Sequence, residues 1–422
     1  MHGHRPAVRG EFERDVAPYA LGGSGDEDDG SCLHASYTMP RMPSPGPRSL
    51  SASLPARLDV RLNARLHARL HARLQAAIAQ NGGWLPFDRY MAIALYEPGL
   101  GYYSRSSGQI GLWPGSGSDF VTAPELSPLF GAALSRQVAQ ALDAAHADEV
   151  FEFGAGTGAL AAQVLGALGP RVRRYNIIDL SGTLRARQAE RLAPFGGQAH
   201  WLDEWPAQMR GVVLGNEVLD AMPVQLLHWD GQAWCERGVR LRDDQLAWGH
   251  QPTLLRPPVE SDFAPGTVVE IHPQAEAFVT TLGERLTCGL ALFIDYGFPE
   301  AEYYHPQRTG GTLMCHRAHL SDTDPLDRPG EKDITAHINF TGIALAAQEA
   351  GLDVLGYTSQ ARFLINCGLP ALMQGADART LSAAQKLINE HEMGELFKVI
   401  ALARGLAFEP IGFAAGDRTH RL

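Results

Sequence analysis

The chain has 422 residues, of which 45% are hydrophobic, and a formal net charge of −11 at pH 7. This length allows one large domain or two medium ones, and the acidic balance disfavours a nucleic-acid binder, which needs basic side chains to neutralise phosphates. No apolar run reaches the roughly 20 residues that span a bilayer, so we expect no membrane insertion. The five cysteines form no CxxC pair, which fits a reducing compartment and argues against a disulfide framework.

The first 81 residues differ in composition from the rest of the chain. Residues 1–55 combine an acidic cluster with a Pro/Ser-rich stretch, which cannot bury enough apolar area to offset chain entropy, and they predict a disordered extension. In residues 56–81, leucines recur every four residues from Leu58 to Leu74, each preceded by arginine. A period of four drifts from the helical 3.6, so the leucine stripe spirals. We favour a partly docked repetitive helix over a partner-binding one.

A globular domain is expected from about residue 82 to 404, followed by a tail at 405–422. Short apolar runs predict strands, and they alternate with helices at about 157–168 and through Arg191. The strands fall at 150–153, 175–179, 212–215, 290–295, 354–357 and 397–403. This alternation predicts an α/β fold with a Rossmann-like, mainly parallel sheet and helices on both faces. Alternating residues around Asp230-Gly231 predict a β-hairpin insertion at about 224–265.

A glycine-rich turn follows the first of these strands, in the segment Glu152-Phe-Gly-Ala-Gly-Thr-Gly158. Gly154 permits a tight turn, Gly156 allows a ligand to approach the backbone, and Gly158 allows close helix packing. The pattern also fits dinucleotide sites. Glu152, two residues before the first glycine, favours S-adenosylmethionine, because it can bind near the methionine ammonium. Asp179 ends the next strand and can accept hydrogen bonds from ribose hydroxyls of either cofactor.

Three polar residues, Asn216, Glu217 and Asp220, follow the 212–215 strand. They are expected at the carboxyl-terminal rim, where open α/β sheets bind ligands. We assign Asn216 to the cofactor, and Glu217 and Asp220 to catalysis, because carboxylates can orient an acceptor and take up its proton. The alternative is that Asn216 and Asp220 cap a turn or a helix.

Four further residues are candidates for the substrate side of the site. Asp119 and Glu125 lie in a Pro-containing loop that could close over the cofactor as a lid. Asp295 ends another strand at the same rim, and His337 lies beyond it. As alternatives, Glu125 is a solvated residue beside a helix that starts at Ser127-Pro128, and His337 is a structural histidine.

Cys315, His316 and His319 lie close together in the sequence. Their spacing provides no fourth ligand, and zinc sites of structural type need four. We therefore expect no metal site.

Several blocks of this sequence resemble the MidA-like family, which includes mitochondrial complex I assembly factors that act as protein arginine methyltransferases. The blocks extend from about residue 82 to about 404. They are residues 87–98, 101–103, 119–127, 216–224, 294–297, 333–340 and 393–400. The sequence departs from the family at Asp179, where we expect glutamate, and at Met314 and His316, in a segment expected to be GTLRCY.

The resemblance implies a class I methyltransferase that uses S-adenosylmethionine and acts on a protein substrate such as a respiratory complex I subunit. A guanidinium is a poor nucleophile while its charge is delocalised, and nearby carboxylates can localise the charge and accept the proton. The resemblance also implies a cytoplasmic protein in a bacterium, or a mitochondrial matrix protein in a eukaryote. The alternatives are a methyltransferase for a small molecule or another nucleophile, a non-catalytic assembly factor that binds S-adenosylmethionine, and a dehydrogenase.

Overall fold

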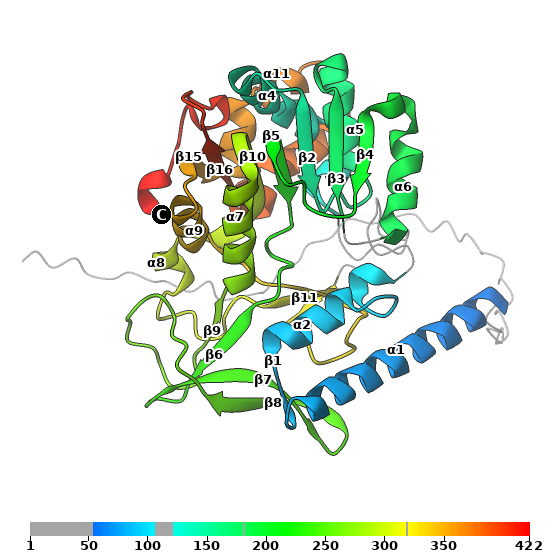
Figure 1. Cartoon of the computed structure of the whole chain (residues 1–422), viewed down its shortest axis with the longest axis vertical. Coiled ribbons are helices and arrows are strands. Elements are labelled where there is room, and N and C mark those ends of the chain that lie inside the picture. The colour runs from blue at the N-terminus through cyan, green and yellow to red at the C-terminus, as the bar shows by residue number, and fades with distance from the viewer. Residues whose placement is uncertain (1–53, 106–120, 180–181, 318–319) are drawn as a thin grey trace, which may run out of the picture. The chain divides into compact units, whose positions relative to one another are not determined.

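The computed structural model of the chain describes residues 54–105, 121–179, 182–317 and 320–422 (Figure 1). The expected disordered extension, apart from Leu54 and Pro55, lies outside these residues, as does Asp119. Within the described part, no helix has the length and hydropathy needed to cross a membrane.

The main sheet has eight strands, in the order β15-β16-β10-β5-β2-β3-β4 with β14 beside β10. From β4 to β10 neighbouring strands are parallel, whereas β16 is antiparallel to both β10 and β15. The mainly parallel sheet that the sequence predicts is therefore confirmed. The strands are β2 (Glu149–Phe153), β3 (Arg174–Ile178), β4 (Ala199–Leu202), β5 (Met209–Asn216), β10 (Leu286–Phe298), β14 (Ile338–Asn339), β15 (Asp353–Ser359) and β16 (Phe397–Arg404).

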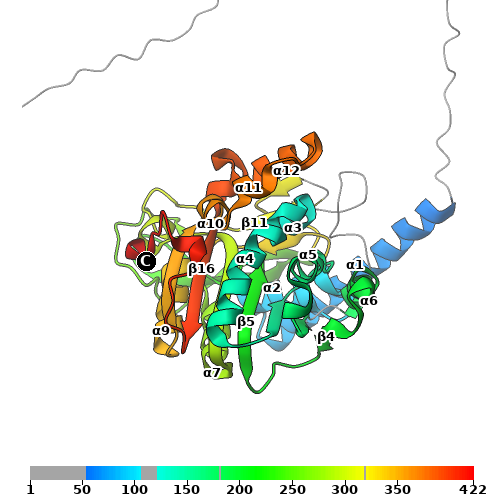
Figure 2. The same ribbon diagram turned by 90° about the horizontal axis from the view of Figure 1, so that it is seen from above.

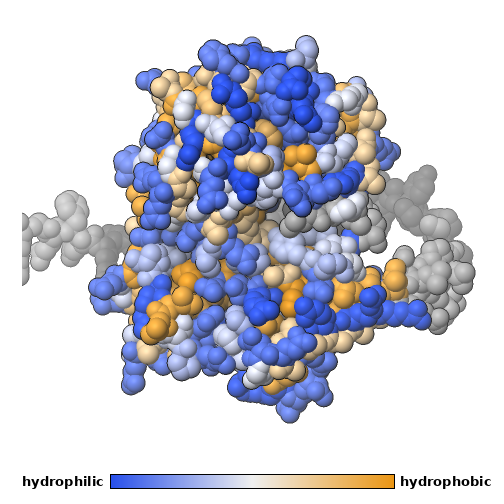
Figure 3. Space-filling view, in the orientation of Figure 1, coloured by the Kyte–Doolittle hydropathy of each residue, from blue (hydrophilic) through white to orange (hydrophobic). Residues whose placement is uncertain are grey.

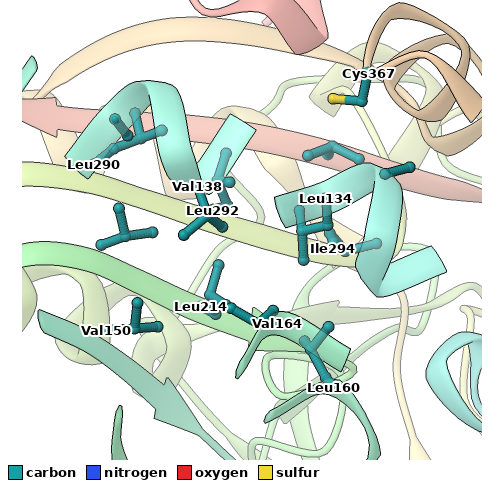
Figure 4. Packing of buried hydrophobic residues seen from close by; sticks show 14 of the residues in the cluster. Leu134, Val138, Val150, Leu160, Val164, Leu214, Leu290, Leu292, Ile294 and Cys367 are labelled. Atoms are coloured by element: carbon teal, nitrogen blue, oxygen red, sulfur yellow. The ribbon is translucent and has the colours of Figure 1, made fainter. Parts of the chain in front are cut away.

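Both faces of this sheet are buried under helices. In β10, Leu290, Leu292 and Ile294 belong to one apolar cluster, while the intervening Ala291 and Phe293 belong to another. Successive side chains of a strand point to opposite faces, so near-continuous apolar strands need cover on both sides. Figure 4 shows the first cluster, where side chains of β10 and β5 meet those of two helices.

The helices divide between these two faces (Figure 2). One face carries α4 (Pro128–Ala145), α5 (Ala159–Leu168), α10 (Gln360–Asn366), α11 (Leu369–Met373) and α12 (Ala378–Ile388). The other carries α7 (Pro273–Arg285) and α9 (Phe340–Glu349). Three further helices are α3 (Ala123–Leu126), α6 (Gly182–Leu192) and α8 (Glu300–Tyr303). The expected α/β fold with helices on both faces is confirmed.

A second, antiparallel sheet has the order β1-β7-β6-β9, with β8 paired to β7. Its strands are β1 (Trp84–Pro86), β6 (Gln225–Trp229), β7 (Trp234–Arg242), β8 (Gln245–Pro252) and β9 (Val268–Ile271). Asp230 stands at the β6–β7 turn, where Oδ1 accepts hydrogen bonds from the N–H groups of Gln232 and Ala233. The sheet thus contains more than the expected hairpin, because β9 and the earlier β1 join it.

Helices α1 (Leu54–Gln80) and α2 (Phe87–Tyr96) pack on this second sheet. The leucine stripe of α1 spirals: Leu62 is 53% exposed, whereas Leu70 and Leu74 are buried against α2 and the sheet. Among the residues whose side chains the structure describes, Leu66, Leu70 and Leu74 of the stripe pack against this apolar cluster. Elsewhere, hydrophilic side chains dominate the face of the molecule seen in Figure 3.

A small third sheet, in the order β12-β11-β13, follows β10 and precedes β14 in sequence and contributes to the site described below. Its strands are β11 (Met314–Arg317), β12 (Leu320–Asp322) and β13 (Asp333–Thr335).

The last 18 residues, which the sequence leaves as a tail, pack against the main sheet's helices in the structure. The ring of Phe413 contacts that of Phe363 in α10, with 5.4 Å between centroids. The N–H of Gly412 donates to Oε1 of Gln137 in α4 at 2.8 Å. Residues 405–422 are thus part of the folded body.

Candidate cofactor and acceptor site

The glycine turn between β2 and α5 has the backbone that the sequence predicts. Gly154, Gly156 and Gly158 have φ angles of +62°, +54° and +79°, a region that side chains disfavour. A Cβ atom on Gly156 would meet nothing within 4 Å, whereas one on Gly158 would lie 3.4 Å from Gln188 of α6. Gly156 therefore exposes bare backbone to open space, and Gly158 allows close approach of α6.

That open space is a cavity of about 690 Å³ at the carboxyl ends of β2, β3 and β5. It lies where the strand order reverses, since the chain proceeds from β2 to β3 on one side and continues through β5 on the other. Ligands of open α/β sheets bind at this position, and the volume suits a ligand of nucleoside size. Its lining includes Glu152, Gly154, Gly156, Asp179, Asn216, Glu217 and Asp220.

Glu152 is the most deeply buried acid beside the glycine turn, at 2% exposure. Its Oε2 accepts a hydrogen bond of 2.8 Å from the hydroxyl of Tyr175. Burial raises the pKa of Glu152 to about 8, the Tyr175 hydrogen bond opposes this rise, and the nearby Asp179 carboxylate adds to it. A cationic ligand would stabilise the ionised form.

Gln188 of α6, which sequence reasoning missed, connects the glycine turn to Asp179. Its Nε2 donates to the carbonyl oxygen of Gly156 at 2.8 Å and to Oδ2 of Asp179 at 2.9 Å. Its Oε1 accepts from Nε1 of Trp201 in β4 at 2.9 Å. The side chain is fully buried, so it fixes both predicted cofactor elements relative to each other.

Glu217 lies across the cavity with a left-handed backbone, φ +54°. Its N–H donates to the carbonyl oxygen of Ile294 at 2.9 Å, and Nδ2 of Asn216 donates to its Oε1 at 3.0 Å. A non-glycine residue in this region stores strain that its surroundings must hold, a feature common at functional sites. Burial raises the pKa of Glu217 to about 8, and the neighbouring Asp220 carboxylate contributes.

Asp295 is placed behind this segment and is not among the residues that line the cavity. Its Oδ2 accepts hydrogen bonds from the N–H groups of Val218 and Leu219, at 3.2 and 2.9 Å. Asp295 also hydrogen bonds to Asp220, and burial raises the pKa of both carboxyl groups, to about 7 for Asp295. Two such close acids retain a shared proton more readily than either would alone.

Aromatic and polar residues outside the predicted cofactor, catalytic and substrate-side sets complete this end. Tyr96, Tyr103 and Tyr296 line the cavity, and so do His316 of β11 and Asp333 of β13. The Tyr103 hydroxyl donates to Oδ1 of Asp333 at 2.8 Å. Three acids from distant segments, Glu217, Asp220 and Asp333, therefore line one end of a single cavity.

Two substrate-side candidates lie elsewhere. His337 stacks on Phe298, with 5.4 Å between ring centroids, and is not among the cavity-lining residues. Glu125 is neither solvated nor part of the lining, because its side chain is 4% exposed and pairs with Arg191 of α6 at 2.6 Å. Among the residues that the structure describes, no group of His, Cys, Asp or Glu could hold a metal ion.

The cavity fits S-adenosylmethionine. Asp179 and Glu152 place two carboxyl groups in its lining, where we expect the ribose and the ammonium, and Leu160 and Ile178 add apolar surface of the kind an adenine needs. Oδ1 of Asn216 is buried and has no hydrogen-bond partner among the described residues. Buried polar atoms are normally paired, so this oxygen is available to a ligand donor.

Together the fold and the cavity define a class I methyltransferase. A model of an S-adenosyl-L-methionine-dependent methyltransferase family matches residues 133–358, more than half of the chain. The chain belongs to this family.

Solved and curated relatives agree with this assignment. A Burkholderia thailandensis protein crystallised with S-adenosyl-homocysteine is 47% identical, with a TM-score of 0.83, and the match covers 90% of this chain and all of that one. The protein arginine methyltransferase NDUFAF7, mitochondrial, of Danio rerio is 26% identical over 74% of this chain and 82% of its own. The Homo sapiens protein of that name is also 26% identical, over 74% and 78%. The expected cofactor, S-adenosylmethionine, is thereby confirmed, and the alternative of a nicotinamide cofactor is not supported.

Proposed function

We propose that the chain methylates a guanidinium nitrogen of an arginine side chain in a protein substrate. The observation that carries this proposal is the acidic end of the cavity, formed by Glu217, Asp220 and Asp333. A buried cluster of carboxyl groups favours a cationic acceptor, because the cation relieves their mutual repulsion and their desolvation. The curated relatives, which are named protein arginine methyltransferases, support the same acceptor.

In this proposal the glycine turn and its neighbours hold the cofactor. The bare backbone of Gly156 admits it, Asp179 accepts hydrogen bonds from its ribose, and Glu152 and Asn216 bind its amino-acid end. When bound, S-adenosylmethionine supplies an electrophilic methyl group on a positively charged sulfur.

Glu217 and Asp220 act on the acceptor. An entering guanidinium lowers the pKa of these carboxyl groups, so that they ionise and localise its charge. Glu217 would hold the guanidinium so that one nitrogen faces the methyl group that the bound cofactor would supply. Asp220, paired with Asp295, takes the proton that this nitrogen loses. Alignment is the main contribution, because the methyl donor already has a good leaving group.

The proposal extends to partner and compartment. We infer a subunit of respiratory complex I as the substrate, on the family resemblance found in the sequence. The compartment is the cytoplasm in a bacterium and the mitochondrial matrix in a eukaryote; the curated relatives named above are mitochondrial.

The test uses S-adenosylmethionine with an isotopically labelled methyl group, the purified chain, and complex I subunits as acceptors. Mass spectrometry should find the label on arginine. Glu217→Gln should slow transfer by roughly 10²–10³, the effect of losing one charge-assisted contact in a closed site, and leave the affinity for S-adenosylhomocysteine unchanged. Glu236→Gln, on the second sheet and outside the cavity lining, is the matched control.

Other outcomes contradict specific parts of the proposal. Label on a small molecule, with none on protein, would replace the acceptor. Equal losses of rate and cofactor affinity in Glu217→Gln would make Glu217 a cofactor ligand, and a lower melting temperature alone would make it structural. No transfer to any acceptor would favour a non-catalytic assembly factor.

A further inference from the structure

A short segment before the main sheet contacts both ends of the cavity. Val121, Thr122 and Pro124, in and just before α3, line it. The backbone N–H of Ala123 interacts with the Glu217 carboxyl group and lowers its pKa, against the larger rise caused by burial. The carbonyl oxygen of Pro124 accepts from Nε2 of Gln163 in α5 at 2.7 Å. Helix α3 is therefore held between the acceptor-side acid and the helix that follows the glycine turn.

Glu125 of the same helix makes the remaining contacts, on the cofactor side. Its Oε1 lies 2.6 Å from Nη1 of Arg191, and its Oε2 accepts from Nη2 at 3.4 Å. The hydroxyl of Thr157, between Gly156 and Gly158, donates to the same Oε1. Nη1 of Arg191 in turn donates to Thr157 Oγ1 at 2.6 Å. Three side chains from α3, the glycine turn and α6 thus form one closed set of hydrogen bonds.

The burial of this set makes its geometry restrictive. The Glu125 side chain is 4% exposed and Thr157 is buried, whereas the Arg191 side chain is 30% exposed. Thr157 is the glycine-turn residue whose side chain joins the network. A buried ion pair adds little net stability but is costly to break from one side. Its main effect is to specify position, here the position of Thr157 relative to α3.

We propose that Glu125 is a positioning residue that couples the glycine turn to Glu217 through α3. Cofactor binding fixes the glycine turn, and the turn fixes Glu125 through Thr157. Ala123, two residues before Glu125 in α3, then restrains the Glu217 carboxyl group. Coupling of this kind links the cofactor's affinity to the order of a distant segment. The cofactor half of the inference stands on the family's established cofactor, and the Glu217 half rests on the proposed function.

The experiment compares Glu125→Gln, Arg191→Gln and the double variant with the wild-type chain. Calorimetry measures affinity for S-adenosylhomocysteine, and amide hydrogen exchange of residues 121–126 is followed with and without it. In the wild type, the ligand should slow exchange in this segment. Each single variant should lose about tenfold in affinity, a typical coupling magnitude, and should lose the ligand-dependent protection. Arg185 lies on the same helix α6 and forms an exposed ion pair with Asp203. Arg185→Gln should change neither the affinity nor the ligand-dependent protection.

The double variant separates positioning from stability. It removes both charges, so its melting temperature should recover toward the wild-type value while affinity and protection remain low. Wild-type affinity and protection in the double variant would overturn the inference and leave a merely structural pair. These readouts need no acceptor, so absence of methylarginine in the wild type would refute the proposed function alone.

Discussion

Glu152 is buried and Glu217 is half-buried in the same cavity, and loss of contact with water raises the pKa of each carboxyl group to about 8. Near neutral pH both are therefore largely protonated in the absence of ligand. The two carboxyl groups differ in which cation is expected to favour their ionised form. Glu152 lies beside the glycine turn, where the cofactor's ammonium is expected, whereas Glu217 lies with Asp220, where a cationic acceptor is proposed.

This difference predicts a pH dependence of cofactor binding. Because the ammonium pairs with ionised Glu152, affinity for S-adenosylmethionine should rise with pH up to about 8 and then level off. Binding below that pH should release protons, which calorimetry in buffers of different ionisation enthalpy detects. Glu152→Gln should bind weakly and without this pH dependence. An affinity of the wild-type chain that stays constant from about pH 6 to about pH 9, on either side of this pKa, would contradict the pairing of Glu152 with the ammonium.

The stability of the ligand-free protein should change in the opposite sense. The folded pKa of Glu152 and Glu217 lies above the ordinary glutamate value of 4.5, so the folded state holds more protons than the unfolded state between pH 4.5 and about 8. Their contribution to stability is present below this range and is lost as pH rises through it.

Sequence reasoning found the residues whose partners are local. Glu152, Asp179 and the glycines follow from the strand–turn–helix pattern, because a few residues of chain determine their arrangement. Gln188 of α6 reaches the glycine turn and Asp179, and Asp333 of β13 reaches the cavity; no local spacing indicates either contact. Asp295 ends a strand at the expected rim, but the N–H groups of residues 218 and 219 occupy its carboxylate.

Among the elements, six of the eight strands of the main sheet were predicted, all except β4 and β14, and the strands of the second sheet were less predictable. Strands buried on both faces leave continuous apolar runs, such as Leu290–Ile294, that the sequence displays directly. The short β1 and β9 gain their partners only from tertiary folding, since β1 pairs with β7 and β9 with β6. The expected insertion was therefore too small.

The β2–turn–α5 element yields a test with an internal control. Gly156→Val should abolish binding of S-adenosylhomocysteine, because a branched side chain would occupy the space where the ligand meets the backbone. Gly169 has nearly the same φ, +53° against +54°, and likewise has nothing within 4 Å of its Cβ position, but lies outside the cavity lining. Gly169→Val should share the backbone strain and keep the affinity. Calorimetry and melting curves on both variants decide the matter; equal affinities would reject the turn as the cofactor site.

At the scale of the whole molecule, the carboxyl-terminal segment connects helices of the main sheet. Phe413 lies on Phe363 of α10, and Ile411 and Gly412 donate backbone hydrogen bonds to Gln140 and Gln137 of α4. This segment has no periodic apolar pattern, because its contacts come from a short 3₁₀ turn at Ile411–Phe413. The segment should therefore contribute to stability without affecting the cavity.

Phe413→Ala should lower the free energy of unfolding by about 3 kcal/mol, the usual loss for a buried phenylalanine, with unchanged affinity for S-adenosylhomocysteine. Urea unfolding measures the first quantity and calorimetry the second. Leu254→Ala, at a side chain that is 95% exposed, is the apolar control and should change neither. A stable Phe413→Ala variant would show that the segment is a dispensable tail.

Strand β1 pairs with β7, which is synthesised about 150 residues later. Leu85 pairs with Val239, and Trp84 donates from Nε1 to the carbonyl oxygen of Gly249. A ribosome therefore releases α1, β1 and α2 well before the strands that cover them exist. Until then the nascent chain presents the apolar face of α2, including Phe87, Tyr90 and Leu95, to the surrounding solution. Such exposed segments aggregate readily, so this amino-terminal part is where the growing polypeptide most needs a chaperone.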